Sequence, residues 1–392
     1  MDLTFLMLVC MLLGIGLIML LSSSSIAAQY DKAAKYTATH YFTNQLIFGM
    51  AGLAIMYLAS RINYQSYRIL SIVAMVAAYV LLVLVFSPIG YGKATTGAQR
   101  WIHVGPLGSL QPSEVAKVAV ILYFSARLSK RNDGEIKYPK GRLISPLEEI
   151  RGLSRKFGFS ELIPYILVLG SVAVLMLLEP HVSGTILVFI GAAAVLFASG
   201  IKMYWFVGGG AVAAIGMWFV MNTMAHSSAR LAVWKDPWTA YYVDGNDKAY
   251  QIVQSLMAVG SGGLMGRGFG QSIQKYNYLP EEQNDFIFAI VCEELGLIGA
   301  SLIILLFILL ILRGYWIALH ARDRFGSLVT VGIITLLAAQ VFLNIAVITN
   351  LIPTTGISLP FFSYGGTALI IQLGEMGIIL GVSRQIPAPS QG

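Results

Sequence analysis

Long apolar stretches separated by short polar connections make up most of the chain. A helix that crosses a bilayer needs about 20 mostly apolar residues, and ten stretches approach that length. We expect membrane-spanning helices at 3–21, 42–60, 69–86, 113–128, 162–178, 183–199, 203–221, 286–312, 328–349 and 365–382. The pattern therefore predicts an all-α polytopic membrane protein with about ten transmembrane helices, in which residues 1–392 form a single integral membrane domain.

Composition supports this class and excludes others. Hydrophobic residues make up 57% of the chain and charged residues 11%, whereas soluble globular proteins carry about 25% charged residues. Intrinsic disorder needs low hydrophobicity, so it is excluded as well. Cys10 and Cys292 both lie in apolar runs, and neither a disulfide framework nor a zinc cluster is expected.

The distribution of basic residues predicts the orientation in the membrane. Most Lys and Arg residues fall in connections on the side of both termini, above all in the basic segment 125–160. Cytoplasmic loops carry such an excess, so we expect both termini inside and the long loop 222–285, between the seventh and eighth spans, outside. The net charge of +7 then reports cytoplasmic loops that attract anionic lipid, and no nucleic-acid partner is expected.

The outer loop 222–285 carries candidate chemistry. Its residues 250–259 place Ile252, Val253, Leu256 and Met257 on one helical face and Gln251, Gln254 and Ser255 on the other. This spacing predicts a short helix lying in the membrane interface. The glycines that follow allow irregular backbone, but they form neither a dinucleotide fingerprint nor a phosphate-binding P-loop.

An acidic cluster closes this loop where the eighth span begins, and it has two interpretations. Asn284 or Asp285 could cap the helix by accepting its unpaired N–H groups, which is the simpler interpretation of the spacing. Alternatively, one carboxylate among Glu281, Glu282 and Asp285 acts as a general base or holds a divalent cation. Neighbouring acids raise the pKa of such a group, and the helix dipole lowers it.

Charged residues also occur within or beside the spans, where they are costly and usually face a cavity. Glu114 and Lys117 are three residues apart, so they share a helix face and can pair. Pro112 and Ser113 mark the outer N-terminus of that helix. Together with Arg100, this end suits a phosphate or pyrophosphate, although a purely structural Glu–Lys pair is the alternative.

Further polar features have similar alternatives. Glu179, Glu293, Glu294 and Glu375 either bond to a neighbouring helix or line a polar site beside the outer loops. The segment 353–367 predicts an irregular outer connection buried in protein or lining water. The five histidines show no metal-binding spacing.

Three runs resemble the signatures of the SEDS family, the shape, elongation, division and sporulation polymerases of bacteria. They are GAQRWIHVGPLGSLQPSEVAK at 97–117, YQIVQSL through LPEEQNDFIFAIVCEELGLIG at 250–299, and PTTGISLPFFSYGG at 353–366. The resemblance extends over nearly the whole chain. The form GQSIQKYNYLPEE is more similar to the division and sporulation branch, FtsW and SpoVE, than to the RodA branch.

The resemblance implies a glycosyltransferase of the bacterial cytoplasmic membrane that joins lipid II units into glycan strands on the outer face. Asp285 matches the essential aspartate of the family motif LPE-x-x-x-DF, and it would take a proton from the acceptor sugar in an inverting transfer. Arg100, Lys117 and Arg230 match family positions and are implied contacts to the diphosphate or the sugars. We predict further substrate contacts from Gln111, Ser113, Glu114, Gln251, Ser255, Lys275, Glu281, Ser363 and Tyr364.

The resemblance also implies partners. We expect a class B penicillin-binding protein, which is a crosslinking transpeptidase, other divisome-type membrane proteins, and membrane lipid. A divalent cation, Mg²⁺ or Mn²⁺, would stabilise the leaving group, although no ligand motif is present, and no organic cofactor is expected. The chain departs from the family pattern at His181, where an Asp is usual, and at Thr367, where a Ser is usual.

Two other functions remain open at this stage. Intramembrane Glu and Lys residues also line transport paths, which would suit a lipid II flippase. A flippase should need polar groups at the midplane and on both sides, whereas this chain gathers them near the outer loops. A non-catalytic cell-wall scaffold is the other alternative, and it predicts that loss of Asp285 is tolerated.

Overall fold

The ten predicted spans all form helices. A computed structural model describes residues 1–30, 37–92, 99–103, 109–130, 159–223, 231, 233–243, 245 and 247–386. The helices are α1 (Leu3–Tyr30), α2 (His40–Arg61), α3 (Tyr67–Leu84), α5 (Pro112–Leu128), α7 (Phe159–Leu178), α8 (Val182–Ala198), α9 (Met203–Thr223), α13 (Ile287–Leu319), α14 (Arg324–Ile348) and α15 (Gly366–Ser383). Among the helices described, six are long and apolar enough to cross a membrane, and α7 and α8 are shorter apolar helices. The chain is a polytopic, mostly helical membrane protein.

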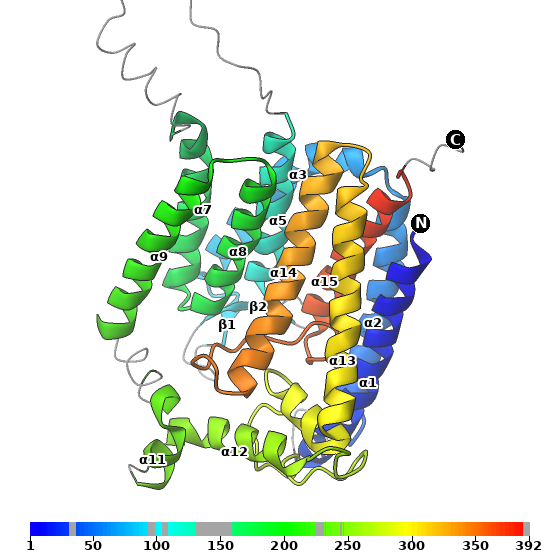
Figure 1. Cartoon of the computed structure of the whole chain (residues 1–392), viewed down its shortest axis with the longest axis vertical. Coiled ribbons are helices and arrows are strands. Elements are labelled where there is room, and N and C mark those ends of the chain that lie inside the picture. Colours follow the sequence, from blue (N-terminus) through cyan, green and yellow to red (C-terminus); the bar gives the residue numbers. More distant parts are fainter. Residues whose placement is uncertain are drawn as a thin grey trace, which may run out of the picture.

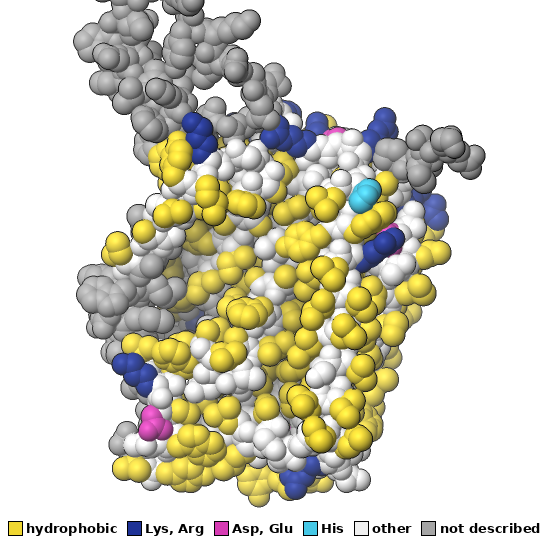
Figure 2. All heavy atoms as spheres, in the orientation of Figure 1, with side chains coloured by type: hydrophobic (Ala, Val, Ile, Leu, Met, Phe, Trp, Pro, Cys, Tyr) yellow, Lys and Arg dark blue, Asp and Glu magenta, His cyan; other side chains and the backbone are white. Residues whose placement is uncertain are grey.

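The arrangement of the two ends agrees with the predicted orientation. Both termini lie at one end of the bundle, and the short helices α11 (Pro237–Tyr242) and α12 (Asp247–Ser261) lie at the other (Figure 1). Lys and Arg side chains gather at the end with the termini, and hydrophobic side chains cover the flank between the ends (Figure 2). Most of the basic loop 125–160 lies outside the described residues.

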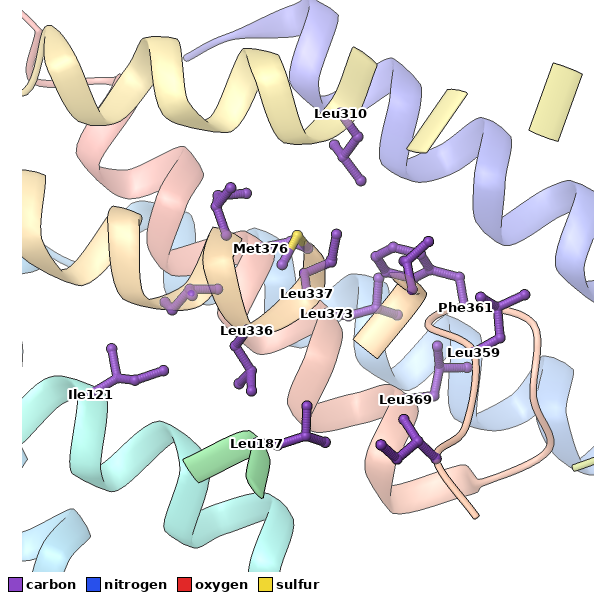
Figure 3. Packing of buried hydrophobic residues seen from close by; sticks show 14 of the residues in the cluster. Ile121, Leu187, Leu310, Leu336, Leu337, Leu359, Phe361, Leu369, Leu373 and Met376 are labelled. Carbon is purple, nitrogen blue, oxygen red and sulfur yellow. The ribbon is translucent and has the colours of Figure 1, made fainter. Parts of the chain in front are cut away.

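The core forms where α13, α14 and α15 meet α5 and α8. Leu310, Leu337, Met376 and Leu373 lie close together within it (Figure 3). Helix α15 also packs along α2, where a Cβ on Gly377 would lie 2.5 Å from the carbonyl oxygen of Met56. Small residues allow such close approach of helix backbones in membranes.

The prediction of an all-α chain misses a small sheet ahead of α5. Three antiparallel strands, β1 (Gly90–Tyr91), β2 (Trp101–His103) and β3 (Ser109–Leu110), pair in the order β1-β2-β3. Strands of two or three residues are too short to give the alternating pattern of four to eight residues by which strands are predicted. The sheet sets the position of Arg100, which directly precedes β2.

The predicted interfacial helix is present as α12, but its polar face is not exposed. Gln254 and Ser255 are buried, and the Ser255 hydroxyl donates a hydrogen bond to the carbonyl oxygen of Ile348 at 3.1 Å. The polar face of α12 therefore contacts the bundle through hydrogen bonds. A single turn, η1 (Tyr64–Ser66), precedes α3 on the opposite side.

The eighth span was predicted as one continuous helix, and the structure breaks it. Gly296 has φ 68° and ψ −171°, which is non-helical backbone inside α13. Glycine tolerates this conformation because it has no Cβ. Helix α13 therefore consists of a short outer part and a long inner part.

Candidate active site

Asp285 lies in the turn that precedes α13, and it does not cap the helix. The cap position of α13 is Phe286, and no side chain caps the helix there. The amide of Asn284 instead donates a hydrogen bond to the Glu281 carboxylate at 2.5 Å. The capping interpretation of Asn284 and Asp285 is therefore wrong, because the cap position falls on Phe286 and neither side chain bonds the first helical N–H groups.

The backbone around Asp285 is held by neighbouring segments. The Asn344 amide of α14 donates hydrogen bonds to the carbonyl oxygens of Asp285, at 2.8 Å, and Ile357, at 2.7 Å. The Ser363 hydroxyl donates to the carbonyl oxygen of Asn284 at 2.7 Å. The Tyr364 N–H donates to the carbonyl oxygen of Gln283 at 2.9 Å. Ser363 and Tyr364, predicted as substrate contacts, fix the position of the turn that carries Asp285.

The Asp285 carboxylate faces the irregular segment before α15. A Cβ on Gly356 would lie 3.2 Å from Asp285 Oδ2, and Gly356 has φ +69°. The carbonyl oxygen of the preceding residue, Thr355, accepts a hydrogen bond from the hydroxyl of Ser183 at the start of α8. The segment thus connects the carboxylate to the outer end of α8.

Burial and neighbouring charges set the protonation of the acidic cluster. The pKa of Asp285 is raised to about 6, mainly by burial and also by the Glu281 charge, while the Arg100 guanidinium acts in the opposite direction. Burial also raises the pKa of Glu282 to about 7. A carboxylate with a pKa near the working pH can both accept and release a proton, as a general base requires.

Arg100 links Asp285 to the turn between α7 and α8. Its guanidinium donates to the carbonyl oxygens of Glu179, at 3.4 Å, and of Pro180. Burial raises the pKa of Glu179 to about 8, against the lowering effect of Arg100. Burial, with the charges of Arg100 and Lys117, lowers the pKa of His181 to about 3. The imidazole is therefore neutral at physiological pH.

The predicted pair at the start of α5 is confirmed. Lys117 Nζ lies 2.7 Å from Glu114 Oε2, and the Lys117 side chain is buried. Gln111, directly before the helix, lies beside His181 with 3.4 Å between the two Nε2 atoms. The outer end of α5 thereby joins the turn that Arg100 contacts.

Several buried polar atoms at the start of α5, in the α7–α8 turn and in the segment after α14 have no hydrogen-bond partner within the described part of the chain. They are Ser113 Oγ, both carboxylate oxygens of Glu179, His181 Nδ1 and Thr355 Oγ1. Buried polar groups in proteins are nearly always paired. Unpaired groups on the start of α5, the α7–α8 turn and the segment after α14 indicate a polar lining that suits a ligand or ordered water.

Other predicted contacts are placed differently. Lys275 Nζ is buried, 3.3 Å from the Glu294 carboxylate, and it donates to the carbonyl oxygen of Gly270 at 2.5 Å. The Gln251 amide donates to the carbonyl oxygen of Pro280 at 3.2 Å, so it supports the acidic turn. Arg230 lies outside the described residues.

The sequence reasoning missed Gly356 and Asn344. A signal was available for Asn344, since an amide inside the apolar stretch 328–349 needs a partner. Glu179 and His181 were noted, but their position beside Arg100 was not anticipated. No group of three or more His, Cys, Asp or Glu residues in the described ranges could hold a metal ion.

Comparisons with known proteins agree along the whole chain. The family of cell cycle proteins that comprises FtsW, RodA and SpoVE matches residues 3–387. Stage V sporulation protein E of Bacillus subtilis is 39% identical over 385 residues, which cover 98% of this chain and 97% of that protein. A probable peptidoglycan glycosyltransferase FtsW of Geobacter sp. (strain M18) is 37% identical over 387 residues, or 98% of this chain and 97% of that one.

Solved structures give the same result. A chain from a peptidoglycan synthase complex, described as coordinating polymerization and crosslinking, superposes with a TM-score of 0.73 at 26% identity, covering 100% of this chain and 99% of that chain. The rod shape determining protein RodA of Thermus thermophilus superposes with a TM-score of 0.67 at 24% identity, covering 99% and 98% of the two chains, and supports the fold alone.

Proposed function

The chain belongs to the FtsW, RodA and SpoVE family and is a peptidoglycan glycosyltransferase of the bacterial cytoplasmic membrane, and we propose that it polymerises lipid II with Asp285 as general base. The assignment of the base rests on the environment of the Asp285 carboxylate. The carboxylate is partly buried, its pKa is raised to about 6, and its turn is held from α14 and the segment before α15. In a capping role, this carboxylate would instead accept a hydrogen bond from the first N–H groups of α13.

The proposed step is a direct displacement. The Asp285 carboxylate takes the proton of the 4-hydroxyl of the acceptor N-acetylglucosamine. The oxygen then forms a bond to the anomeric carbon of the donor N-acetylmuramic acid, and the bond from that carbon to the undecaprenyl diphosphate breaks. The configuration at this carbon inverts, and no covalent sugar–enzyme intermediate forms. Catalysis then depends on positioning, on the base and on stabilising the diphosphate.

Two basic groups at the outer ends of the helices suit the leaving diphosphate. Arg100 interacts electrostatically with Asp285, and Lys117 lies at the start of α5 with its ammonium on Glu114. A lysine ammonium has three donors, so this pairing leaves capacity for a phosphate oxygen. The N-terminus of α5 adds favourable electrostatics for an anion. We propose Arg100 and Lys117 as diphosphate contacts, with Gln111, Ser113 and Glu114 lining the same end.

The same family supports a transpeptidase as the partner. One structural neighbour is part of a peptidoglycan synthase complex in which polymerization and crosslinking are coordinated. We propose that the partner of this chain is a class B penicillin-binding protein, within a division or sporulation complex. We also propose that Mg²⁺ or Mn²⁺ binds mainly to oxygens of the diphosphate, without a dedicated set of protein ligands.

The direct test is polymerisation of lipid II by the purified chain with its transpeptidase in lipid nanodiscs. We expect Asp285→Asn to slow glycan formation about 10²- to 10⁴-fold. Asp236→Asn is the matched control, since Asp236 is another outer-loop carboxylate and only caps α11. Equal glycan from Asp285→Asn and the parent protein would contradict the assignment of the base. Translocation of labelled lipid II without polymer would instead favour a flippase, and growth of cells with Asp285→Ala would favour a scaffold.

A further inference from the structure

The glycine-rich turn 262–268 after α12 is bonded to the broken part of α13. At the break, the N–H groups of Leu297 and Ile298 donate to the carbonyl oxygens of Gly263, at 2.9 Å, and Leu264, at 3.2 Å. In return, the N–H groups of Arg267 and Gly268 donate to the carbonyl oxygens of Glu293, at 2.9 Å, and Glu294, at 3.1 Å. The turn thus satisfies the backbone groups that the break at Gly296 releases.

The two backbones approach closely because glycines meet at the contact. A Cβ on Gly266 would lie 2.2 Å from the carbonyl oxygen of Glu294, and one on Gly262 would lie 2.0 Å from that of Cys292. This close pairing matters for a membrane protein. Non-helical backbone at membrane depth is stable only where its polar groups are satisfied within the protein.

The tip of the turn presents two large apolar side chains to its surroundings. Leu264 is 66% exposed and Met265 79% exposed. They lie beside Leu297, 61% exposed, and Ile298, which begin the outward-facing surface of the inner part of α13. The exposed tip is therefore continuous with a helix surface that faces lipid.

The depth of the tip follows from α1. The apolar run of α1 ends at Leu21, and the hydroxyl of the next residue, Ser22, donates to the Glu294 carboxylate at 2.7 Å. Glu294 therefore lies at the outer edge of the apolar layer. Arg313 of α13 pairs with Asp2 before α1. At 1.5 Å per residue, the unbroken inner part of α13 extends about 22 Å from Arg313 to Ile298, to which Leu264 bonds, whereas α1 extends about 30 Å from Asp2 to Ser22. Leu264 consequently lies deeper than this edge.

We propose that Leu264 and Met265 insert into the outer leaflet and contact lipid acyl chains, which makes the turn 262–268 a membrane anchor of the outer loop. The polar groups at its base fit this position. Arg267 reaches back to Glu293 with 3.3 Å between Nη1 and Oε1, as long basic side chains do at a membrane interface. Lys275 is paired with Glu294. The anchor does not depend on the proposed general base.

The test uses nitroxide labels in a Cys10→Ala, Cys292→Ala background of the full chain in lipid nanodiscs. Met265→Cys is compared with Leu302→Cys on the outer surface of α13 and with Gln271→Cys on the same loop, since all three side chains are exposed. We expect the ratio of collisions with oxygen to collisions with a water-soluble nickel chelate to be several-fold higher at Met265 and Leu302 than at Gln271. A ratio at Met265 equal to that at Gln271 would overturn the proposal.

Two further measurements test the insertion without relying on the label at Met265. Leu264→Cys should behave as Met265→Cys does, and it replaces that variant if the labelled protein does not fold. Met265→Glu should lower the melting temperature in nanodiscs, whereas Gln271→Glu should not, because only the first places a charge among acyl chains. Equal melting temperatures for the two Glu variants would also contradict insertion.

Discussion

The backbone of Gly356 lies against the carboxylate of Asp285, so close that a Cβ on residue 356 would stand 3.2 Å from Oδ2. The two residues are far apart in sequence, and the Asn344 amide holds both of their segments through the carbonyl oxygens of Asp285 and Ile357. The carboxylate is therefore confined on one side by backbone, and the side chain as a whole is only partly buried.

Gly356→Ala should impair catalysis more than folding. The new methyl group would displace the Asp285 carboxylate, and the left-handed backbone costs a residue with a Cβ about 1–2 kcal/mol. We expect glycan polymerisation to fall about tenfold. Gly365→Ala is the matched control, because its φ is 174° and its Cβ would make only an ordinary 3.6 Å contact with Ala368. Equal rates for the two variants would show that the gap at Gly356 is unimportant.

Asp285 predicts an acid limb in the pH–rate profile. Below about pH 6 the carboxyl is protonated and cannot accept a proton, so the rate should fall as the pH decreases through this value. Asp285→Asn should lose about 10²- to 10⁴-fold in rate at neutral pH. Glu282→Gln should keep the midpoint near 6, although the pKa of Glu282 is also raised. A midpoint that shifts in Glu282→Gln would show that Glu282, and not Asp285, produces the acid limb.

Arg100→Gln should move that limb to higher pH. The guanidinium lowers the pKa of Asp285, so its removal raises this pKa and more alkaline conditions are needed to ionise the base. The measurement is the midpoint of the pH–rate profile. Arg267→Gln is the control, because its partner is Glu293, and it should leave the midpoint unchanged. A shift toward acid in Arg100→Gln would exclude the proposed electrostatic role.

Glu179 predicts a pH-dependent stability. Its pKa is about 8 in the folded protein against 4.5 for the unperturbed group, so its contribution is present below 4.5 and is lost as the pH rises through 8. The slope approaches about 1.4 kcal/mol per pH unit between these values. Melting temperatures measured from pH 5 to 8 should fall less for Glu179→Gln than for the parent protein. Asp236→Asn should show the parent's slope, and identical slopes for all three proteins would refute the effect.

The spans were predictable because membrane burial requires about 20 apolar residues, and this constraint is local in sequence. The ion pair of Glu114 with Lys117 was predictable for the same reason, since residues three apart share a helix face. Asp285 was identified as the candidate base by its resemblance to a family motif, and spacing alone favoured a cap. The direction of its side chain depends on Asn344 and Ser363, which are distant in sequence.

The missed features share one physical cause, which is competition between local preference and tertiary partners. Gly296 alone does not predict a break in an apolar span, because the break is stable only with the turn 262–268 beside it. Ser255 and Lys275 looked available to a substrate, yet Ile348 and Glu294 bind them. A polar residue in a sequence does not reveal whether its partner is protein or ligand.

The side-chain amide of Asn344 ties the site to α14. Since this one group holds the backbone on both sides of the gap between Asp285 and Gly356, a sideways shift of the helix carries both walls in the same direction. The distance between the Asp285 carboxylate and Gly356 would then stay constant while both move relative to the rest of the bundle.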